Sequence, residues 1–243
     1  MNTDTSTNPN QKQPYLGDLE KTAVIDALCK VPPKQRDSLW RDKFFAHIPE
    51  ASMRTNNQQV VVGPDGFPYF QLYLPVPNAQ FQCYTLKHLL GDFVIANGLG
   101  IVINPDKPSP DWVFSYGDLL NFHLTHQFYT PSDETSQSAT LTLPAGQTML
   151  LGQPSETYLP APARLNIKKM LSKMGVDDVR LLLLFRPEAR SQELVFNLTP
   201  DKVGDLARCN ACMQRISWFL PRHYVLLSVP EDNPSFRDKF ADL

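Results

Sequence analysis

The stretch Gly98-Leu99-Gly100-Ile101-Val102-Ile103-Asn104-Pro105, followed after a polar turn by Trp112-Val113-Phe114-Ser115, decides the fold of this chain. The first run is apolar and β-branched, and it stops at Asn-Pro. The second run is aromatic and stops at a residue that can cap a helix. Ser115-Tyr116-Gly117-Asp118 has the spacing of a capping box, which predicts a helix from Asp118 to about His126. The segment therefore predicts a strand, a turn, a second strand and a helix.

Upstream of this segment the sequence predicts a β-hairpin and three helices. Two β-prone runs flank Gly63-Pro64-Asp65-Gly66, a turn in which Pro presets φ and Gly accepts positive φ. Gly98 is expected to end the third helix in the left-handed conformation. The predicted elements are helices at 18–31, 34–47 and 85–96 and hairpin strands at 60–62 and 67–74.

Downstream, a stretch with three prolines at 153–162 predicts a stiff crossover, and a regular pattern follows it. Apolar residues spaced i, i+3, i+4 and i+7 indicate a helix that Gly175 ends. The predicted elements are short strands at 139–143 and 148–151, helices at 162–174 and 199–220, strands at 179–185, 193–198 and 224–229, and possible anchors Phe236 and Phe240 in the tail.

These elements predict an α+β fold with two small α/β-sandwich domains. Their sheets are expected to be mainly antiparallel or mixed, with helices packed on one face. The predicted divisions are a disordered tail at 1–16, a first domain at 17–152, a Pro-rich crossover at 153–161 and a second domain at 162–243.

Composition excludes several classes of partner. The chain has 243 residues and a net charge of −2, so no electrostatic footprint for nucleic acid is expected. Lys168, Lys169 and Lys173 form the one local basic patch, which is interpreted as a solvated helix face. No signal peptide or membrane-spanning run is recognised, which predicts a cytoplasmic protein whose four cysteines are thiols.

Cys209-Asn210-Ala211-Cys212 matches a Cys-x-x-Cys motif, but its expected position argues against redox chemistry. A redox pair needs a thiolate stabilised at a helix N-terminus, and this pair is expected about ten residues inside a helix that starts at Thr199. The apolar spacing favours core cysteines, with a metal site or a redox site as alternatives.

His123 and His126 could present two imidazoles one turn apart. Only Asp133 and Glu134 lie close enough in sequence to supply a third ligand. Histidines in a last helical turn also favour the negative end of the helix dipole, so the metal interpretation stays an alternative. No metal ion or cofactor is expected.

Catalytic signatures are missing from the sequence. It contains no Gly-x-Ser-x-Gly elbow, no Walker loop and no Gly-x-Gly-x-x-Gly fingerprint. No acidic pair stands in apolar surroundings as an acid and base couple would. The missing motifs favour a non-catalytic protein over an enzyme without deciding between them.

Aromatic residues crowd the predicted hairpin. Alternation places Phe67, Tyr69 and Tyr73 on one face, where they form either a partly exposed partner-binding row or a cross-strand ladder beneath a helix. The first interpretation predicts that Tyr69 and Tyr73 contact a protein partner.

In this order, the features resemble the bacterial enhanced serine sensitivity protein B (SseB-like) family over most of residues 25–230. The matching features are Asp65-Gly66-x-Pro68, helix 85–96, Gly100-x-Val102-x-Asn104-Pro105, the capped helix at Ser115, and Pro144-Ala145-Gly146 with Leu150-Leu151-Gly152-Gln153-Pro154 as the interdomain bridge. The chain lacks the aromatic-rich tail expected after Phe240. The resemblance implies a cytoplasmic bacterial protein of two α+β domains, with no catalytic residues to transfer.

Three functional hypotheses follow. The leading one is a non-catalytic protein-binding or regulatory adaptor that uses Phe67, Tyr69 and Tyr73. The alternative is a small-molecule sensor or enzyme with an interdomain pocket near Asn104, Asp106 and residues 153–162. A secretion-linked immunity or chaperone protein is the third.

Overall fold

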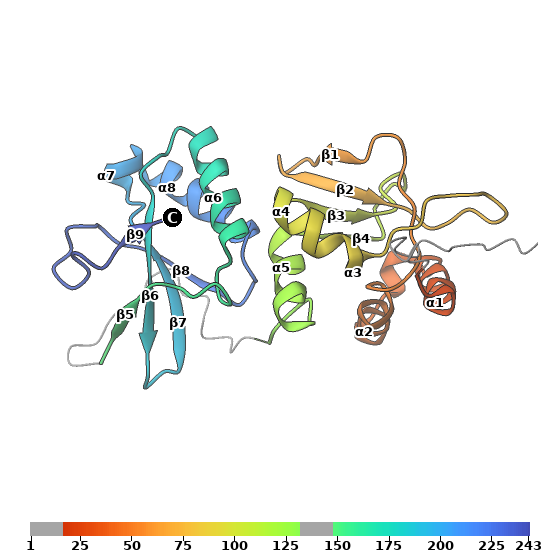
Figure 1. Cartoon of the computed structure of the whole chain (residues 1–243), viewed down its shortest axis with the longest axis horizontal. Coiled ribbons are helices and arrows are strands. Elements are labelled where there is room, and N and C mark those ends of the chain that lie inside the picture. Colours follow the sequence, from red (N-terminus) through yellow and green to blue (C-terminus); the bar gives the residue numbers. More distant parts are fainter. Residues whose placement is uncertain (1–16, 132–147) are drawn as a thin grey trace, which may run out of the picture.

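The computed structural model describes residues 17–131 and 148–243, which form two lobes along the long axis of the molecule (Figure 1). We call residues 17–131 the first lobe and residues 148–243 the second lobe. Each lobe is built on its own sheet, with four and five strands, so the predicted α+β class with two mixed sheets is confirmed. In the described ranges, every helix is too short or too polar to cross a bilayer.

The first lobe holds a sheet in the order β1-β2-β3-β4. β2 lies antiparallel to β1 and parallel to β3, and β4 runs antiparallel to β3. Its elements are α1 (Leu19–Cys29), the 3-10 helix η1 (Pro33–Gln35), α2 (Ser38–His47), β1 (Val60–Val62), β2 (Pro68–Leu72), α3 (Leu86–Leu89), the π-helix η2 (Leu90–Val94), α4 (Ile95–Asn97), β3 (Gly100–Ile103), β4 (Trp112–Phe114) and α5 (Tyr116–Thr125).

Local capping signals correctly placed several helix ends in this lobe. Thr85 caps α3, and Gly98 ends α4 with φ of 67°. Ser115 and Asp118 form the predicted capping box at the start of α5. The predicted hairpin and the two strands after Gly98 are likewise confirmed.

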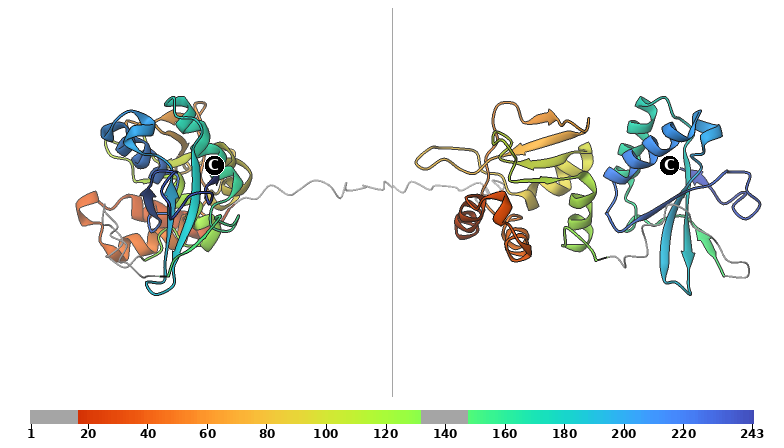
Figure 2. Two further views of the ribbon diagram at one scale, coloured as in Figure 1. Left: turned by 90° about the vertical axis from the view of Figure 1, so that its left-hand side faces the viewer. Right: turned by 180° about the vertical axis from the view of Figure 1, so that it is seen from behind.

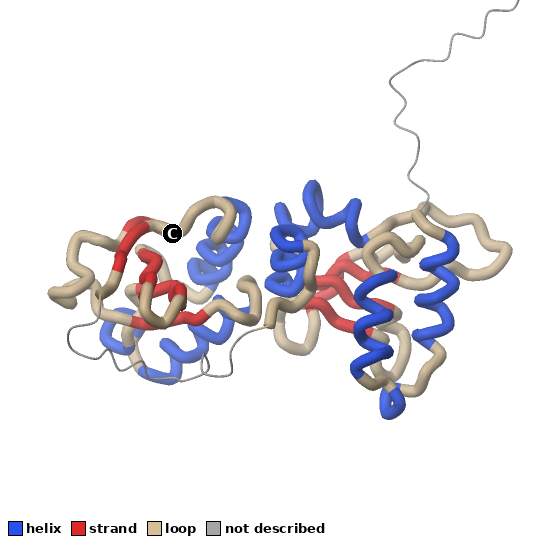
Figure 3. Tube along the Cα trace, turned by 90° about the horizontal axis from the view of Figure 1, so that it is seen from below, coloured by secondary structure: helices blue, strands red, loops and turns tan. Residues whose placement is uncertain are grey.

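One face of this sheet carries the core of the first lobe. Phe70, Ile101 and Phe114 share a register row, so their side chains point to the same face. Phe70 packs against Phe93 of η2, with ring centroids 5.3 Å apart, and Phe114 packs against Phe45 of α2 at 6.2 Å. The helices therefore cover this face, as predicted; Figure 3 shows them around the strands.

The second lobe holds the order β5-β6-β7-β8, with β9 also paired to β6. Most of its pairs are antiparallel, and β7 and β8 are parallel. Its elements are β5 (Leu150–Gly152), α6 (Ala161–Lys173), β6 (Arg180–Arg186), β7 (Ser191–Phe196), α7 (Pro200–Val203), α8 (Leu206–Trp218), β8 (Val225–Ser228) and β9 (Ala241–Asp242).

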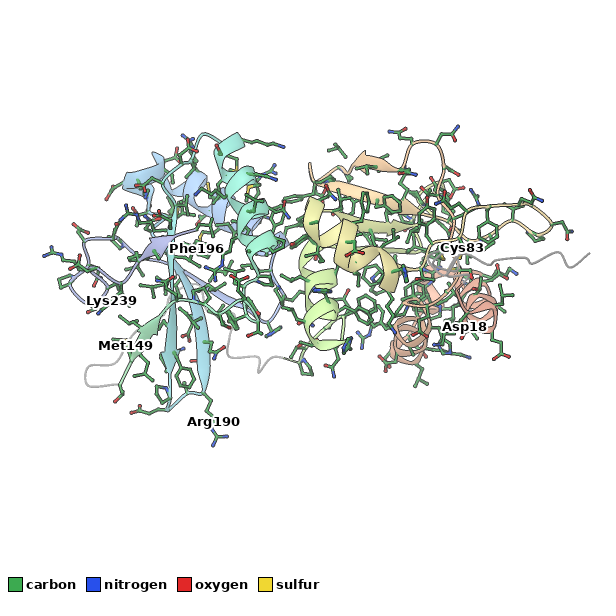
Figure 4. All side chains as sticks on the ribbon, viewed as in Figure 1. Asp18, Cys83, Met149, Arg190, Phe196 and Lys239 are labelled. Atoms are coloured by element: carbon green, nitrogen blue, oxygen red, sulfur yellow. The ribbon has the colours of Figure 1, made fainter. Side chains whose placement is uncertain are left out.

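The two faces of this sheet are covered differently. Leu181, Leu194 and Phe196 belong to the cluster that packs with the helices, and Figure 4 shows Phe196 inside the lobe. On the other face, Leu182 packs in a cluster with Phe236 of the tail, which is only 3% exposed. Phe236 is therefore an anchor, as predicted.

Three predicted boundaries are wrong. The predicted helix 34–47 begins only at Ser38, and residues 33–35 form the separate 3-10 helix η1. β5 pairs with β6, so residues 150–152 belong to the second lobe and not to the first domain. The predicted helix 199–220 is two helices, because Gly204 adopts a φ of 116° and Asp205 then caps α8. The predicted strand at 139–143 lies outside the described residues.

Helices of the two lobes face each other between the two sheets. α6 contacts α4, and α8 contacts α5. Figure 2 shows the same arrangement from behind, with the helices at the boundary of the lobes. The contact between the lobes, which we call the junction, therefore includes helices of both lobes.

Candidate functional site

The predicted partner-binding row is buried in the junction. Phe67 and Tyr69 are 8% and 6% exposed. Phe67 stacks on Trp218 of α8, with ring centroids 4.1 Å apart and planes 2° apart. The Trp218 Nε1–H donates to the Tyr69 hydroxyl at 3.1 Å. The prediction of a partly exposed row is therefore wrong: these rings meet a helix of the same chain.

Tyr73 is also buried, at 6% exposure, although it lies away from Trp218. Its hydroxyl donates to Gln71 Oε1 at 2.9 Å, and the Arg54 guanidinium lies 5.0 Å from its ring centroid. Tyr73 thus closes the outer face of β2 within the first lobe, and its assignment to a partner surface is corrected as well.

Close backbone packing fixes the junction. A Cβ placed on Gly117 would lie 1.9 Å from the carbonyl oxygen of Leu220, so only glycine fits there. Arg222 donates two hydrogen bonds to the buried Asp118 carboxylate, at 2.7 and 2.9 Å. Asn166 Nδ2 donates to the Ile95 carbonyl at 3.1 Å. The two lobes therefore meet as one packed unit.

Beside these contacts lies a cavity of about 550 Å³, which we call the junction cavity. Both lobes contribute to its wall. The lining residues are Gly66, Phe67, Pro68, Ala96, Asn97, Gly98, Asn166, Lys169, Met170, Lys173, Met174, Arg215 and Phe219. The wall combines apolar side chains, amides and three cations, and none of the described residues in it is acidic.

The three cations reach the cavity from two helices. Lys169 and Lys173 are one turn apart on α6, and Arg215 comes from α8. The Arg215 guanidinium lies 5.2 Å from the Phe67 ring centroid, and a Cβ on Gly66 would lie 3.4 Å from its Nη2. Among the described residues, none of the three forms an ion pair with a carboxylate.

The prediction that Lys169 and Lys173 lie on a solvated helix face is confirmed, because both are exposed, but their position on the wall of a cavity was not predicted. The signal that distinguishes them is the lack of an acidic residue at i±3 or i±4 on their own helix. Arg215 and Phe219 were missed, because only the fold brings α8 against the hairpin turn at residues 63–66.

Asn104 lies far from the junction, at the opposite end of β3 from Gly100. Its φ is 51°, and its Oδ1 accepts from the Leu74 amide at 3.1 Å while its Nδ2 donates to Asp111 at 2.6 Å. Asp106 is exposed in the turn that follows. Neither lines the junction cavity, so the predicted interdomain pocket at Asn104 and Asp106 is wrong.

Asp111 gathers the polar groups around Asn104. Arg36 Nη2 and Lys107 Nζ each lie 2.6 Å from a carboxylate oxygen of Asp111, whose side chain is 1% exposed. Burial alone would raise the pKa of Asp111, but the hydrogen bonds from Lys107, Asn104 and Arg36 lower it below its usual value. We call Arg36, Asn104, Lys107 and Asp111 the Asp111 cluster. Its donors and acceptors satisfy each other.

Cys209 and Cys212 belong to the core, as the favoured interpretation predicts; they are 4% and 0% exposed. Their predicted position about ten residues inside a helix is wrong, because α8 begins at Leu206 and Cys209 lies near its start. The Cys209 thiol contacts the Leu198 carbonyl at 3.1 Å, and burial raises the pKa of Cys212.

His123 and His126 are exposed at the end of α5, where His126 caps the helix with a φ of 61°. Asp133 and Glu134 lie outside the described residues. Within the described residues, no three histidine, cysteine or acidic side chains lie close enough together to hold a metal ion.

Comparison with known proteins gives no match. No family model, no curated protein and no solved structure is significantly similar to this chain. The function must therefore be argued from the site itself.

Proposed function

We propose that this protein is a non-catalytic binding protein that takes up a small anionic molecule in the junction cavity. The observation that carries this proposal is the convergence of Lys169, Lys173 and Arg215 on one cavity whose lining has no acidic residue. Unneutralised cations that face a shared space attract an anion, and partial enclosure strengthens the attraction relative to bulk water.

The chemistry of the lining supports binding without catalysis. Among the described residues, the lining contains no serine, cysteine, histidine, aspartate or glutamate, so the two lysines have no partner there for a nucleophile–base or acid–base pair of the usual kind. Its apolar part (Phe67, Met170, Met174 and Phe219) can bury an organic body. Because the cations come from the second lobe and Phe67 from the first, both lobes are needed for the site.

This proposal favours the sensor hypothesis over the adaptor hypothesis. Burial of Phe67, Tyr69 and Tyr73 removes the surface on which the adaptor hypothesis depended. Membership of the SseB-like family and a cytoplasmic location stay predictions from the sequence.

A binding screen tests the proposal. Unfolding temperatures of the full chain would be measured at low salt with small carboxylates, phosphates and sulfates, and with neutral sugars as the comparison set. We expect at least one anion to raise the unfolding temperature, and the effect to disappear in Lys169→Gln/Lys173→Gln. The double variant Lys34→Gln/Lys43→Gln removes the same charge from exposed lysines outside the cavity and should respond like the wild type. If no anion acts, or if both double variants respond equally, the proposal is wrong.

A further inference from the structure

The number and spacing of the cations restrict the ligand further; this step rests on the proposed function. Side chains at i and i+4 of a helix start about 5–6 Å apart, so the ammonium groups of Lys169 and Lys173 can reach the same small group. Arg215 approaches the same cavity from α8. Three cations are thus available to one anionic group.

A single carboxylate satisfies this arrangement poorly. It carries one negative charge and leaves two of the three cations unneutralised. A phosphoryl monoester carries a charge of about −1.5 to −2 at pH 7 and offers three acceptor oxygens. It therefore neutralises more of the positive charge than a carboxylate does, and it offers one acceptor oxygen to each of the three cations.

Arg215 favours the same group. Its guanidinium lies 5.2 Å from the Phe67 ring centroid, which restricts the side chain before any ligand arrives. A guanidinium held in this way can donate hydrogen bonds from two nitrogens to two phosphate oxygens. Because the side chain is already restricted, it loses less conformational entropy when the ligand binds.

The rest of the lining calls for an organic body on the phosphate. Phe67, Met170, Met174 and Phe219 contribute apolar surface to a cavity of about 550 Å³. A bare phosphate ion would occupy a small part of that volume, whereas ligand sites of this size hold drug-sized molecules.

We infer that the ligand of the junction cavity is a phosphate monoester of an apolar or aromatic small molecule. The phosphoryl group contacts Lys169, Lys173 and Arg215, and the organic body lies mainly against the half-buried Met170 and Met174, because Phe67 and Phe219 are only 8% and 5% exposed.

Calorimetric titration of the full chain with three probes tests this inference: phenyl phosphate, benzoate and inorganic phosphate. We expect phenyl phosphate to bind about tenfold or more tightly than either of the others. Benzoate lacks the phosphoryl group and inorganic phosphate lacks the aromatic body, whereas phenyl phosphate has both. Its affinity should fall between pH 7.5 and pH 5.5, since the second phosphate pKa is about 6, whereas benzoate stays ionised over this range.

Arg215→Lys keeps the positive charge and removes the planar guanidinium, so the affinity for phenyl phosphate should fall by about tenfold. Arg190→Lys is the matched control; Figure 4 shows Arg190 at the tip of the β6–β7 hairpin, away from the junction. Equal affinity for benzoate and phenyl phosphate, or an unchanged affinity in Arg215→Lys, overturns this inference and leaves the proposed function in place. If none of the three probes nor any anion of the screen binds, both are overturned.

Discussion

The Asp111 cluster and the junction cavity both gather basic side chains, but only one of them contains an acid. In the Asp111 cluster, Arg36 and Lys107 each lie 2.6 Å from a carboxylate oxygen of Asp111. Their charges are therefore neutralised, and the ion pairs hold the turn after β3 against the α1–α2 connection. In the junction cavity, Lys169, Lys173 and Arg215 face a lining with no carboxylate. Cations that are already neutralised serve the fold, and those that are not remain available to a ligand.

The largest effect is expected from removing the acid of the Asp111 cluster. Asp111→Ala leaves the Arg36 guanidinium, whose side chain is 11% exposed, without its carboxylate. Breaking a buried pair in this way costs about 3–5 kcal/mol in the free energy of unfolding. Urea denaturation would measure the loss. Asp106→Ala, which removes an exposed neighbouring acid, should change stability by less than about 0.5 kcal/mol. Equal losses in the two variants would contradict a structural role for Asp111.

The ion pair between Asp111 and Arg36 also makes the free energy of unfolding depend on pH. The folded-state pKa of Asp111 lies below its unfolded value, so its stabilisation is present above the unfolded pKa and is lost as pH falls through the folded one. Wild type should therefore lose stability below about pH 4 by an amount that Asp111→Ala no longer shows. Denaturation curves of both proteins across this range give the difference directly.

An intermediate effect is expected when an acid is supplied to the junction cavity. Ala96 lies exposed on the cavity wall, and Ala96→Glu would place a carboxylate among the three cations. Relative to the isosteric Ala96→Gln, we expect a gain of about 0.2–1 kcal/mol in stability at low salt and weaker binding of anions. A gain that persists unchanged at high salt would show that the effect is not electrostatic.

The smallest effect is expected from removing the unpaired lysines. Lys169→Gln/Lys173→Gln removes a like-charge pair at i and i+4, so the free energy of unfolding should rise by a few tenths of a kcal/mol, about 0.2–0.5. Without a ligand present, a loss of stability would mean that these lysines already have a structural partner. Denaturation at two salt concentrations checks the cause, because salt screens the repulsion between the two lysines and the gain should therefore shrink at high salt.

The sequence predicted those elements whose signals are local. The capping box at Ser115, the left-handed Gly98 and the Pro-Asp-Gly turn each depend on neighbours within a few residues, and all three were placed correctly. The break at Gly204 was missed although Asp205 is a good capping residue, because the apolar spacing of 199–220 continues across the break.

The candidate site depended on contacts that no local pattern encodes. Phe67 and Trp218 are far apart in the sequence, and the aromatic row of the hairpin reads the same whether a partner protein or α8 covers it. Asn104 marked a real structural position, but its left-handed backbone and its bond to Asp111 explain it without a ligand. The sequence therefore identified structurally important residues, but it did not show which part of the fold each of them contacts.

The stacking of Phe67 on Trp218 also has a consequence for how the chain can be divided. Rings of both lobes share one hydrophobic cluster across the junction, so either half produced separately would display an adhesive aromatic surface. A fragment that ends at residue 131 and a second fragment that begins at residue 148 should therefore associate when they are mixed. The two fragments could then be used as a split protein, whose reassembly through the junction shows that two molecules fused to them have met.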